Sequence, residues 1–358
     1  MLKNENIIFT NQVENALTDV VKNIAPRGIF VLADTNTAQF VLPRLQNLCE
    51  PLYNATVIRT NAGDASKNIE AATQIWQALV NGGATRKSLL INVGGGMVTD
   101  LGGFAAATFK RGMHCVNIPT TLLGAVDAAV GGKTAINLLN CKNLVGVFSE
   151  PDAVIISTVF FATLTQQELL SGYAEVIKHA MLSGPEDFSE VMGYDLTSPG
   201  YDPDGLLQLL QKSISVKTGI VARDPREKGL RKALNLGHTV GHAFESLALE
   251  RKSPVPHGYA VANGLVAETV LSSMLEDFDS SLLHTLAAYI RERYPAFAFT
   301  CDDYPRLLAF MAQDKKNDSP DAINFTLLHA PGQPVIDVTV APDKITAALD
   351  VYRDLMGL

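Results

Sequence analysis

Four polar side chains recur at helical spacing within one short, largely apolar stretch of the chain: Arg231, Asn235, His238 and His242. Positions i, i+4, i+7 and i+11 share one face of an α-helix, so the spacing predicts one continuous helix that presents all four together. Gly237 and Gly241 stand inside this predicted helix, each at a cost of about 1 kcal/mol relative to alanine, which indicates close approach to its backbone. Paired histidines favour a metal ion, and the arginine favours an anionic substrate.

The simpler interpretation of the same stretch is a structural helix with two hydrogen-bonded histidines and a surface arginine. Spacing alone pairs His238 with His242 as metal ligands, as in i, i+4 zinc helices. Glu175 lies in another apolar helical stretch, three residues before Lys178. It is either a member of an ion pair or a carboxylate ligand that completes a three-ligand catalytic zinc site. A further histidine, His257, precedes a glycine at a predicted turn.

The composition limits the class of protein. The chain has 358 residues, of which 47% are hydrophobic, so two domains with a sizeable core are expected. A net charge of −8 argues against a nucleic-acid partner, although it leaves room for a local basic pocket. The four cysteines lack CxxC spacing and are typical of reduced thiols. Without a signal-peptide pattern or a bilayer-length apolar run, we expect a cytoplasmic protein with no membrane partner.

The first part of the chain alternates strand and helix patterns. Strands are predicted over residues 28–34, 55–60, 88–93, 114–118 and 154–157, with an amphipathic helix over 65–79. Strands separated by helices predict a Rossmann-like α/β domain with a parallel sheet covered on both faces. Nucleotides bind such sheets at the carboxyl ends of the strands.

The second part of the chain is predicted to be helical. Helical patterns cover residues 166–182, 204–221, 230–249, 261–274 and 280–293, and a small hairpin is predicted from 324–328 with 335–340. We therefore expect an α/β domain over 1–165 and an all-α domain, apart from that hairpin, over 166–358. With no low-complexity linker between them, the active site is expected in the cleft between the two domains.

A glycine turn after one predicted strand is the first candidate for phosphate binding. Gly94–Gly96 precedes a helix and is either a pyrophosphate-binding turn or a plain tight turn, since it is not the GxGxxG fingerprint. Thr120 and Thr121 add hydroxyls at the end of the next strand. Residues 131–134, GGKT, resemble the end of a P-loop, but Asp127 stands where the earlier glycine is required, which excludes a P-loop NTPase.

Basic residues recur at polar breaks in apolar sequence: Arg111, Lys133, Lys142, Lys178, Lys217, Arg231, Lys315 and Lys316. Any one of them alone is typical of a solvated surface. Several of them converging in an acidic protein would predict a small, multiply anionic substrate.

Six ordered blocks carry a family resemblance: GGGMVTDLGGFAAATFKRG, IPTTLLGAVDAAVGGKTAIN, CKNLVGVF, LLSGYAEVIKHA, RKALNLGHTVGHAFE and HGYAVA. Together they resemble the 3-dehydroquinate synthase family of the sugar-phosphate cyclase superfamily, over roughly residues 60–320. The resemblance implies an NAD-binding N-terminal domain, a metal-binding helical C-terminal domain and a homodimer. It also implies NAD as a recycled cofactor and one divalent metal ion, typically zinc, with cobalt as the alternative.

The resemblance assigns roles to individual residues. It places the metal ligands on Glu175, His238 and His257, against the pair nominated by spacing, and makes His242 a pocket residue. It implies a set of catalytic and substrate-contacting residues: Asp127, Lys133, Asn143, Lys178, Lys217, Arg231 and Asn235, with Arg111 for a phosphate, reaching the neighbouring subunit's site, and one of Lys315 and Lys316. It implies cofactor contacts from Asp34, Asp64, Lys67, Gly95, Gly96, Met97, Val98, Thr99, Asp100, Thr120, Thr121, Lys133, Lys142, Phe160 and Thr163.

The chain departs from the family pattern at several positions. The usual HGEAVA has Tyr259 in place of glutamate, the usual VDSSVGGK has Ala128 and Ala129 in place of serines, and Cys141 replaces a glycine. Residues 63–67 are a loose version of the family's ribose-side loop. None of these changes removes an implied catalytic group, but Tyr259 alters the surroundings expected for the metal.

The implied activity is conversion of 3-deoxy-D-arabino-heptulosonate 7-phosphate to 3-dehydroquinate and phosphate, a step of the shikimate pathway. Two other enzyme classes fit part of the pattern. A metal-dependent polyol dehydrogenase would need fewer cations and would release NADH. A sister cyclase acting on sedoheptulose 7-phosphate would lack groups for a carboxylate, whereas Arg231 and Asn235 are both present. A catalytically inactive NAD-binding regulator would not need the intact histidines and lysines.

Overall fold

The computed structural model describes residues 6–139, 141–196, 202–313 and 323–358. Their contacts divide the chain into two compact units, Met1–Leu169 with Pro199–Ile214 and Leu170–Ser198 with Ser215–Leu358. Helix α8 (Pro203–Arg223) therefore begins in the first unit and ends in the second. The division into domains 1–165 and 166–358 stays a prediction.

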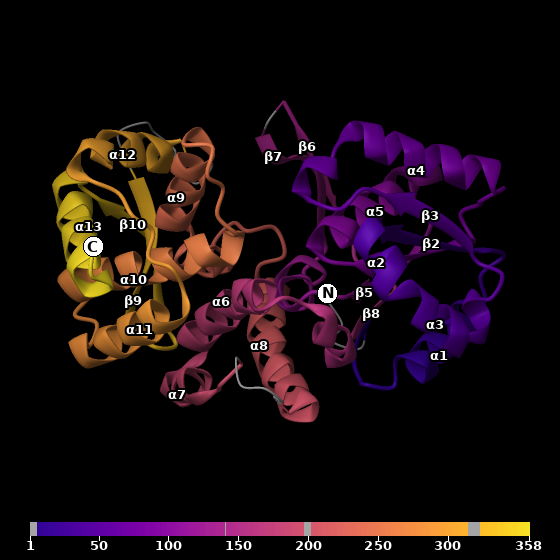
Figure 1. Cartoon of the computed structure of the whole chain (residues 1–358), viewed down its shortest axis with the longest axis horizontal. Helices are drawn as coiled ribbons and strands as arrows, with labels where there is room; N and C mark the ends of the chain where they lie inside the picture. Colours follow the sequence, from indigo (N-terminus) through magenta and orange to yellow (C-terminus); the bar gives the residue numbers. More distant parts are fainter. Residues whose placement is uncertain (1–5, 140, 197–201, 314–322) are drawn as a thin grey trace. The chain divides into compact units, whose positions relative to one another are not determined.

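A six-stranded parallel sheet organises the first unit (Figure 1). Its strand order is β1-β8-β5-β4-β2-β3. The strands are β1 (Ile7–Phe9), β2 (Ile29–Asp34), β3 (Thr56–Thr60), β4 (Leu89–Gly94), β5 (His114–Pro119) and β8 (Ala153–Ile156). The central strands are continuous buried apolar runs, as expected for strands covered on both faces. The predicted Rossmann-like sheet is confirmed, and only the short strand β1 was missing from the prediction.

The order in which the chain adds strands to the sheet reverses at β2: β3 is added on one side of β2, and β4 is then added on the other side. Strand β2 pairs in parallel with β3 on one side and with β4 on the other. Ligands of open α/β sheets bind at such a reversal, beyond the carboxyl ends of the strands. Asp34 is the last residue of β2 and Gly94 is the last residue of β4. Two of the segments that the sequence nominated for a nucleotide therefore end at the reversal point.

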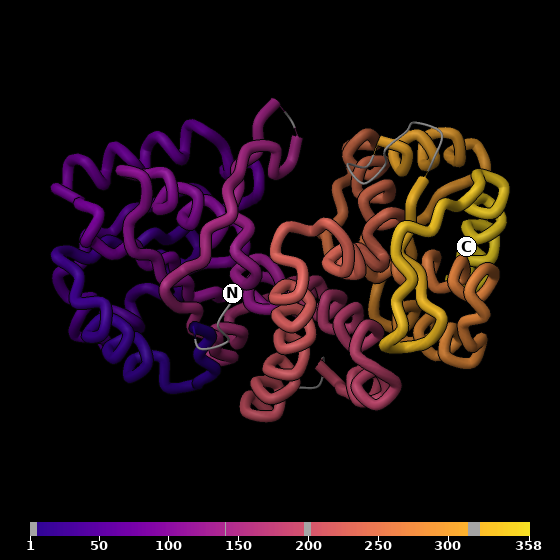
Figure 2. The backbone as a smooth tube through the Cα atoms, turned by 180° about the vertical axis from the view of Figure 1, so that it is seen from behind, coloured from indigo at the N-terminus to yellow at the C-terminus, as the bar shows by residue number. Residues whose placement is uncertain are grey.

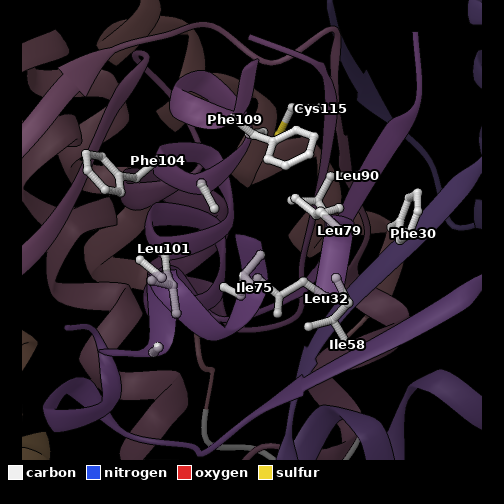
Figure 3. Packing of buried hydrophobic residues seen from close by; sticks show 14 of the residues in the cluster. Phe30, Leu32, Ile58, Ile75, Leu79, Leu90, Leu101, Phe104, Phe109 and Cys115 are labelled. Atoms are coloured by element: carbon white, nitrogen blue, oxygen red, sulfur yellow. The ribbon is translucent and has the colours of Figure 1, made fainter. Parts of the chain in front are cut away.

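Helices cover both faces of this sheet (Figure 1). Helices α4 (Ile69–Asn81) and α5 (Gly96–Thr108) lie on one face, and α1 (Val13–Ile24) and α3 (Leu42–Leu48) lie on the other. Figure 3 shows Ile75 and Leu79 of α4, and Leu101 of α5, packed with Leu32 and Leu90 of the strands. Each such side chain contributes about 1.5–3 kcal/mol by leaving water. This core holds the start of α5 against the sheet.

A second, two-stranded sheet in the first unit was not predicted. Strands β6 (Lys133–Leu138) and β7 (Cys141–Phe148) form an antiparallel hairpin. Strand β6 packs on α5, where a Cβ at Gly103 would lie only 2.6 Å from Thr134. Strand β7 is exposed along almost its whole length, including Leu144 and Phe148. Because both of its faces are exposed, β7 lacks the alternation by which strands are recognised.

The second unit is built from helices and one hairpin. The helices are α6 (Gln166–Ser183, whose first turn belongs to the first unit), α7 (Pro185–Gly193), α9 (His238–Glu250), α10 (His257–Leu275), α11 (Ser280–Arg293), α12 (Tyr304–Ala312) and α13 (Pro342–Met356). The predicted hairpin is present as β9 (Ile323–Ala330) and β10 (Gln333–Val340), and the backbone can be followed to the C-terminal α13 in Figure 2. Among the described residues, every helix is too short or too polar to cross a membrane.

The predicted continuous helix over 230–249 is wrong. A 3₁₀ helix (Leu230–Asn235) carries Arg231 and Asn235, and α9 begins anew at His238. Gly237 separates them with φ of 78° and ψ of −8°, a left-handed conformation that glycine adopts without strain. A Cβ on Gly237 would also lie 2.7 Å from Leu265. The four polar residues therefore do not lie on one helix face.

Candidate functional site

Two imidazoles and one carboxylate converge in the second unit. Glu175 of α6, His238 at the start of α9 and His257 at the start of α10 bring one ligand atom each to within 4.8 Å of one another. His238 Nε2 lies 3.3 Å from Glu175 Oε1, and His257 Nε2 lies 3.6 Å from the same oxygen. Three separate helices thus bring together two nitrogen ligands and one oxygen ligand, a set suited to zinc.

Hydrogen bonds at the far side of each imidazole fix its orientation. His238 Nδ1 lies 3.0 Å from the carbonyl oxygen of Leu236, and His257 Nδ1 lies 3.1 Å from Glu245 Oε2. Carbonyl and carboxylate oxygens only accept, so both Nδ1 atoms donate and both Nε2 atoms face Glu175. Metal-binding histidines in proteins are held in this way.

The electrostatics of the cluster leave a place for a cation. Burial, and then the Lys178 ammonium, lower the pKa of His238 to about 4, so its Nε2 is an acceptor at neutral pH. Burial by itself raises the pKa of Glu175, but Lys178 and His238 hold it well below its usual range. An acceptor nitrogen therefore faces an acceptor oxygen 3.3 Å away. A positive ion between them would satisfy both atoms.

Glu175 itself is fully buried and incompletely satisfied. Its Oε2 forms an ion pair with Lys178, yet neither carboxylate oxygen has a hydrogen bond of acceptable geometry among the described residues. A buried carboxylate without hydrogen bonds is costly unless another partner compensates it. The donor set, the orientation of both imidazoles and this carboxylate all fit a divalent metal ion.

His242 lies beside the cluster and outside its converging atoms. Its ring centroid is 5.3 Å from that of His238, and it groups with Glu245 and His257 in a second set of close polar atoms. Its side chain is exposed.

Tyr259, the departure from the family pattern, packs edge-on against Tyr294 with ring centroids 5.2 Å apart. The carboxylate that hydrogen-bonds to His257 is instead that of Glu245. Glu245 lies in the HAFE segment of the family blocks, but it was not among the predicted site residues.

Among the described residues of the second unit, three lysine or arginine side chains that were predicted to contact substrate are buried: Lys178, Lys217 and Arg231. Arg231 Nη1 donates to the carbonyl of Pro225 at 2.9 Å. Asp224 fixes the loop before Arg231, because its carboxylate accepts from the backbone N–H groups of Lys228, Gly229 and Arg231. Asn235 Nδ2 lies 3.4 Å from Glu227 Oε1. These contacts hold the 3₁₀ helix that carries Arg231 and Asn235.

The glycine turn of the first unit opens directly into α5. Gly95 is the N-cap of α5, and no side chain of the described residues caps this end. A Cβ on Gly95 would lie 3.0 Å from Thr121, and one on Gly96 would lie 2.9 Å from Ala128. N–H groups at a helix start that no side chain caps among the described residues, combined with closely packed glycines, suit a phosphate group.

Asp34 and Thr121 of the first unit accept hydrogen bonds from the backbone, and Thr120 beside them is buried. Asp34 Oδ1 caps helix α2 (Thr35–Phe40) by accepting from the N–H groups of Asn36 and Thr37, both at 2.8 Å. Thr121 Oγ1 accepts from Gly124 N–H at 3.0 Å. Thr120 is buried after β5. These residues therefore stand at the carboxyl edge of the sheet in fixed orientations.

A buried lysine joins further cofactor candidates, Asp64 and Asp100, into one network with Asn143. Lys67 Nζ lies 2.9 Å from Asp100 Oδ2 and 2.5 Å from Asn143 Oδ1. Asn137, which the sequence analysis missed, donates to Asp64 from Nδ2 at 3.1 Å and accepts from Asn143 N–H at 2.9 Å. The structure thus brings together residues from the start of α5, the 3₁₀ turn Asp64–Ser66 and the β6–β7 hairpin.

The other predicted residues are placed around these elements. Met97, Val98 and Thr99 form the first turn of α5, Phe160 and Thr163 lie in a 3₁₀ helix, and Asp127 lies in a π-helical turn (Gly124–Ala128). Lys133 and Lys142 are exposed on the hairpin. Arg111 is exposed and has φ of 66°, which is rare for arginine. Lys315 and Lys316 lie outside the described residues.

The chain shares its fold, a parallel sheet followed by a largely helical unit, with several enzymes of known structure. The chain superposes on 2-deoxy-scyllo-inosose synthase, solved with carbaglucose-6-phosphate, NAD+ and Co2+, with a TM-score of 0.81, 20% identity, and coverage of 96% of this chain and 95% of that one. It superposes on 2-epi-5-epi-valiolone synthase from Streptomyces hygroscopicus, solved with NAD+ and Zn2+, with a TM-score of 0.82, 22% identity, and coverage of 97% and 96%.

Sequence comparison is more specific. The 3-dehydroquinate synthase N-terminal model matches residues 57–171, and the 3-dehydroquinate synthase C-terminal model matches residues 172–317. The 3-dehydroquinate synthase of Parabacteroides distasonis is 44% identical over 357 residues, which covers 100% of both chains. That of Pyrococcus furiosus is 38% identical over 279 residues, covering 77% of this chain and 79% of the relative. The chain belongs to the 3-dehydroquinate synthase family.

Proposed function

We propose that this chain converts 3-deoxy-D-arabino-heptulosonate 7-phosphate to 3-dehydroquinate and phosphate. The conversion would involve transient oxidation and re-reduction of the substrate, β-elimination of phosphate and intramolecular aldol closure, with NAD supplying the redox chemistry when bound. The enzyme would thus be a phosphate-eliminating carbon–oxygen lyase of the shikimate pathway. The convergence of Glu175, His238 and His257, in a chain whose two halves both match the family models, carries the proposal.

Glu175, His238 and His257 would hold the divalent metal ion, zinc or cobalt. Bound metal would lower the pKa of two adjacent substrate hydroxyls, and bound NAD would accept a hydride and return it. Lys178 neutralises part of the charge of Glu175, and Glu245 and the Leu236 carbonyl keep both imidazoles aimed at it. Three protein ligands leave coordination positions for the hydroxyls.

The buried cations would bind the two anionic ends of the substrate. Lys217 and Arg231 are almost fully buried cations of the second unit. They would pair with the substrate carboxylate and phosphate, with Asn235, His242, Lys133, Asn143 and Arg111 as further contacts. We propose that the substrate phosphate takes the proton during β-elimination, with Asp127 close to the cofactor.

NAD would bind at the carboxyl edge of the parallel sheet. The pyrophosphate would lie at the start of α5, over Gly95 and Gly96, where no side chain of the described residues caps the helix. Asp34, Asp64 and the Lys67–Asp100 pair would contact the ribose side. Thr120, Thr121, Lys142, Phe160 and Thr163 complete the proposed contacts. The protein would act as a homodimer in the cytoplasm.

Release of phosphate from the heptulosonate phosphate, with and without added NAD and zinc, tests the proposal. Purified protein stripped of metal and nucleotide should release phosphate only when both are restored. Turnover should leave no lasting rise in NADH absorbance, since the hydride returns to the substrate. Stoichiometric NADH release would instead favour a polyol dehydrogenase. Turnover of sedoheptulose 7-phosphate in place of the heptulosonate would favour a sister cyclase.

A further inference from the structure

A buried carboxylate outside the proposed metal set reaches the same region of the second unit. Glu268 of α10 is completely buried. Its Oε2 accepts from Gly237 N–H at 2.7 Å, and its Oε1 accepts from Val240 N–H at 2.9 Å. Gly237 is the N-cap of α9 and Val240 is in its first turn. A side chain of one helix therefore caps the start of another.

Glycines at the crossing of α9 and α10 allow this contact. A Cβ on Gly264 would lie 2.1 Å from the carbonyl oxygen of Gly237 and 2.7 Å from the backbone nitrogen of Gly241. Gly264 stands one helical turn before Glu268 on the same face of α10. The two backbones can thus approach closely enough for the Glu268 carboxylate to reach the first N–H groups of α9.

The capped end of α9 is where His238 stands. Gly237 has no side chain of its own to cap the helix, so the Glu268 carboxylate satisfies N–H groups that would otherwise be buried without a partner. The left-handed conformation of Gly237 also sets the direction of the Leu236 carbonyl, which lies 3.0 Å from His238 Nδ1. His238 Nε2 in turn faces Glu175 at 3.3 Å.

We propose that Glu268 is the positioning residue for His238. By holding the N–H groups of Gly237 and Val240, it fixes the break between the 3₁₀ helix and α9 and, through it, the hydrogen bond that aims the imidazole at Glu175. Its negative charge at a helix N-terminus is also favourable. This inference rests on the proposed function, because it takes Glu175, His238 and His257 as the metal ligands.

The alternative is that Glu268 stabilises the helix crossing without affecting His238. Substitution at Glu268 together with a matched core variant separates the two. Glu268→Gln keeps one acceptor oxygen, Glu268→Ala keeps none, and Val270→Ala removes two buried methyl groups about half a helical turn away, on the other side of α10. All three should lower the melting temperature. Only the two Glu268 variants should change the metal site.

The readouts are zinc affinity, measured by chelator competition, and the visible absorption of the cobalt-loaded protein. We expect a loss of zinc affinity that is graded from Gln to Ala and reaches about 10- to 100-fold, with a shifted cobalt spectrum. Val270→Ala should keep the wild-type affinity and spectrum. If the Ala variant fails to fold, Glu268→Asp, which keeps the charge but shortens the reach, takes its place in the series.

The possible outcomes are distinct. Wild-type affinity and spectrum in Glu268→Gln and in the shortened or truncated variant would overturn the inference, as would an equal loss in Val270→Ala. A changed chemical shift of the His238 Nδ1 proton in metal-free Glu268→Gln, with the wild-type shift in Val270→Ala, would support it independently of metal. Wild-type protein that binds no zinc or cobalt would overturn the proposed function itself, and the inference with it.

Discussion

The imidazole of His257 donates from Nδ1 to Glu245, which lies one helical turn before the end of α9, at 3.1 Å. Glu245 is buried, so this hydrogen bond is shielded from water. The opposite nitrogen of the ring, Nε2, faces Glu175 at 3.6 Å. The hydrogen bond to Glu245 occupies Nδ1 and thus leaves Nε2 as the nitrogen of His257 that is available to a metal ion.

Removing the carboxylate of Glu245 should weaken the metal site without abolishing it. Glu245→Ala leaves His257 Nδ1 without its acceptor, and we expect zinc affinity to fall about 10- to 100-fold. Glu245→Gln retains an amide oxygen as acceptor and should lose less. Chelator competition measures both. Equal, wild-type affinity in the two variants would mean that water replaces Glu245 without cost.

Metal content of three purified variants distinguishes the proposed ligand set from the pair suggested by spacing. Glu175→Ala and His257→Ala should each lose most of the bound metal, because each removes one of three ligands. His242→Ala should keep the metal while losing activity. His284→Ala, an exposed histidine of α11, is the control and should keep both. Full metal in His257→Ala with depleted metal in His242→Ala would restore the His238–His242 pair.

Metal binding should release about one proton at neutral pH. Burial alone would lower the pKa of His257, but the adjacent Glu175 carboxylate and the hydrogen bond to Glu245 raise it to about 10 in the metal-free protein. The pKa of His238 is lowered to about 4, so His238 is already neutral. A metal ion must therefore displace one proton, from His257. Apparent zinc affinity should rise about tenfold per pH unit between pH 6 and 8. Calorimetry in buffers of different ionisation enthalpy measures the proton, and a pH-independent affinity would contradict the expectation.

Lys67 should matter for the stability of the first unit and for nucleotide binding. Lys67→Met removes one partner of Asp100, whose side chain is only 15% exposed, and the hydrogen bond to Asn143 Oδ1. We expect a loss of about 1–3 kcal/mol in the free energy of unfolding, together with weaker NAD binding. Lys87→Met, at an exposed lysine of the same unit, should change stability by less than about 0.5 kcal/mol. Denaturant titration and NAD fluorescence measure the two effects; equal behaviour of the variants would remove Lys67 from the site.

Two glycine-to-alanine changes should have opposite effects on stability. Gly264→Ala would place a methyl group 2.1 Å from the Gly237 carbonyl, and it should destabilise the protein by about 1–3 kcal/mol or more. Gly219→Ala, on α8, meets no atom within 4 Å and should be neutral or stabilising by up to about 1 kcal/mol. Thermal unfolding compares them. A tolerated Gly264→Ala would show that α9 and α10 can move apart without cost.

The sheet and most helices could be predicted because their signals are local. Buried apolar runs identified β2 and β4, and periodicity placed a helix over 280–293, the same residues as α11. The break at Gly237 could not be predicted in this way, because Glu268 and Leu265, far along the chain, set it. Local spacing fits an uninterrupted helix equally well. Strand β7 was missed for a different reason, since its exposed residues carry no burial pattern.

Local spacing was also insufficient to predict the ligands of the candidate metal site. Spacing finds ligands that share one helix, and it nominated His238 with His242. Glu175, His238 and His257 lie on three helices, so only the resemblance to a family could group them from sequence. Their roles stay a prediction, although the structure brings the three together. The residues that orient them, Glu245 and Glu268, left no sequence signal apart from being acidic in apolar helices.

The order in which the chain leaves the ribosome matters for a unit assembled from two separate segments. The first unit consists of Met1–Leu169 together with Pro199–Ile214, so its last part is made only after about thirty residues of the second unit. The first unit therefore stays incomplete while that intervening segment emerges. A fragment that stops at residue 165 would lack this final piece permanently, and the two units cannot be separated by cutting one peptide bond.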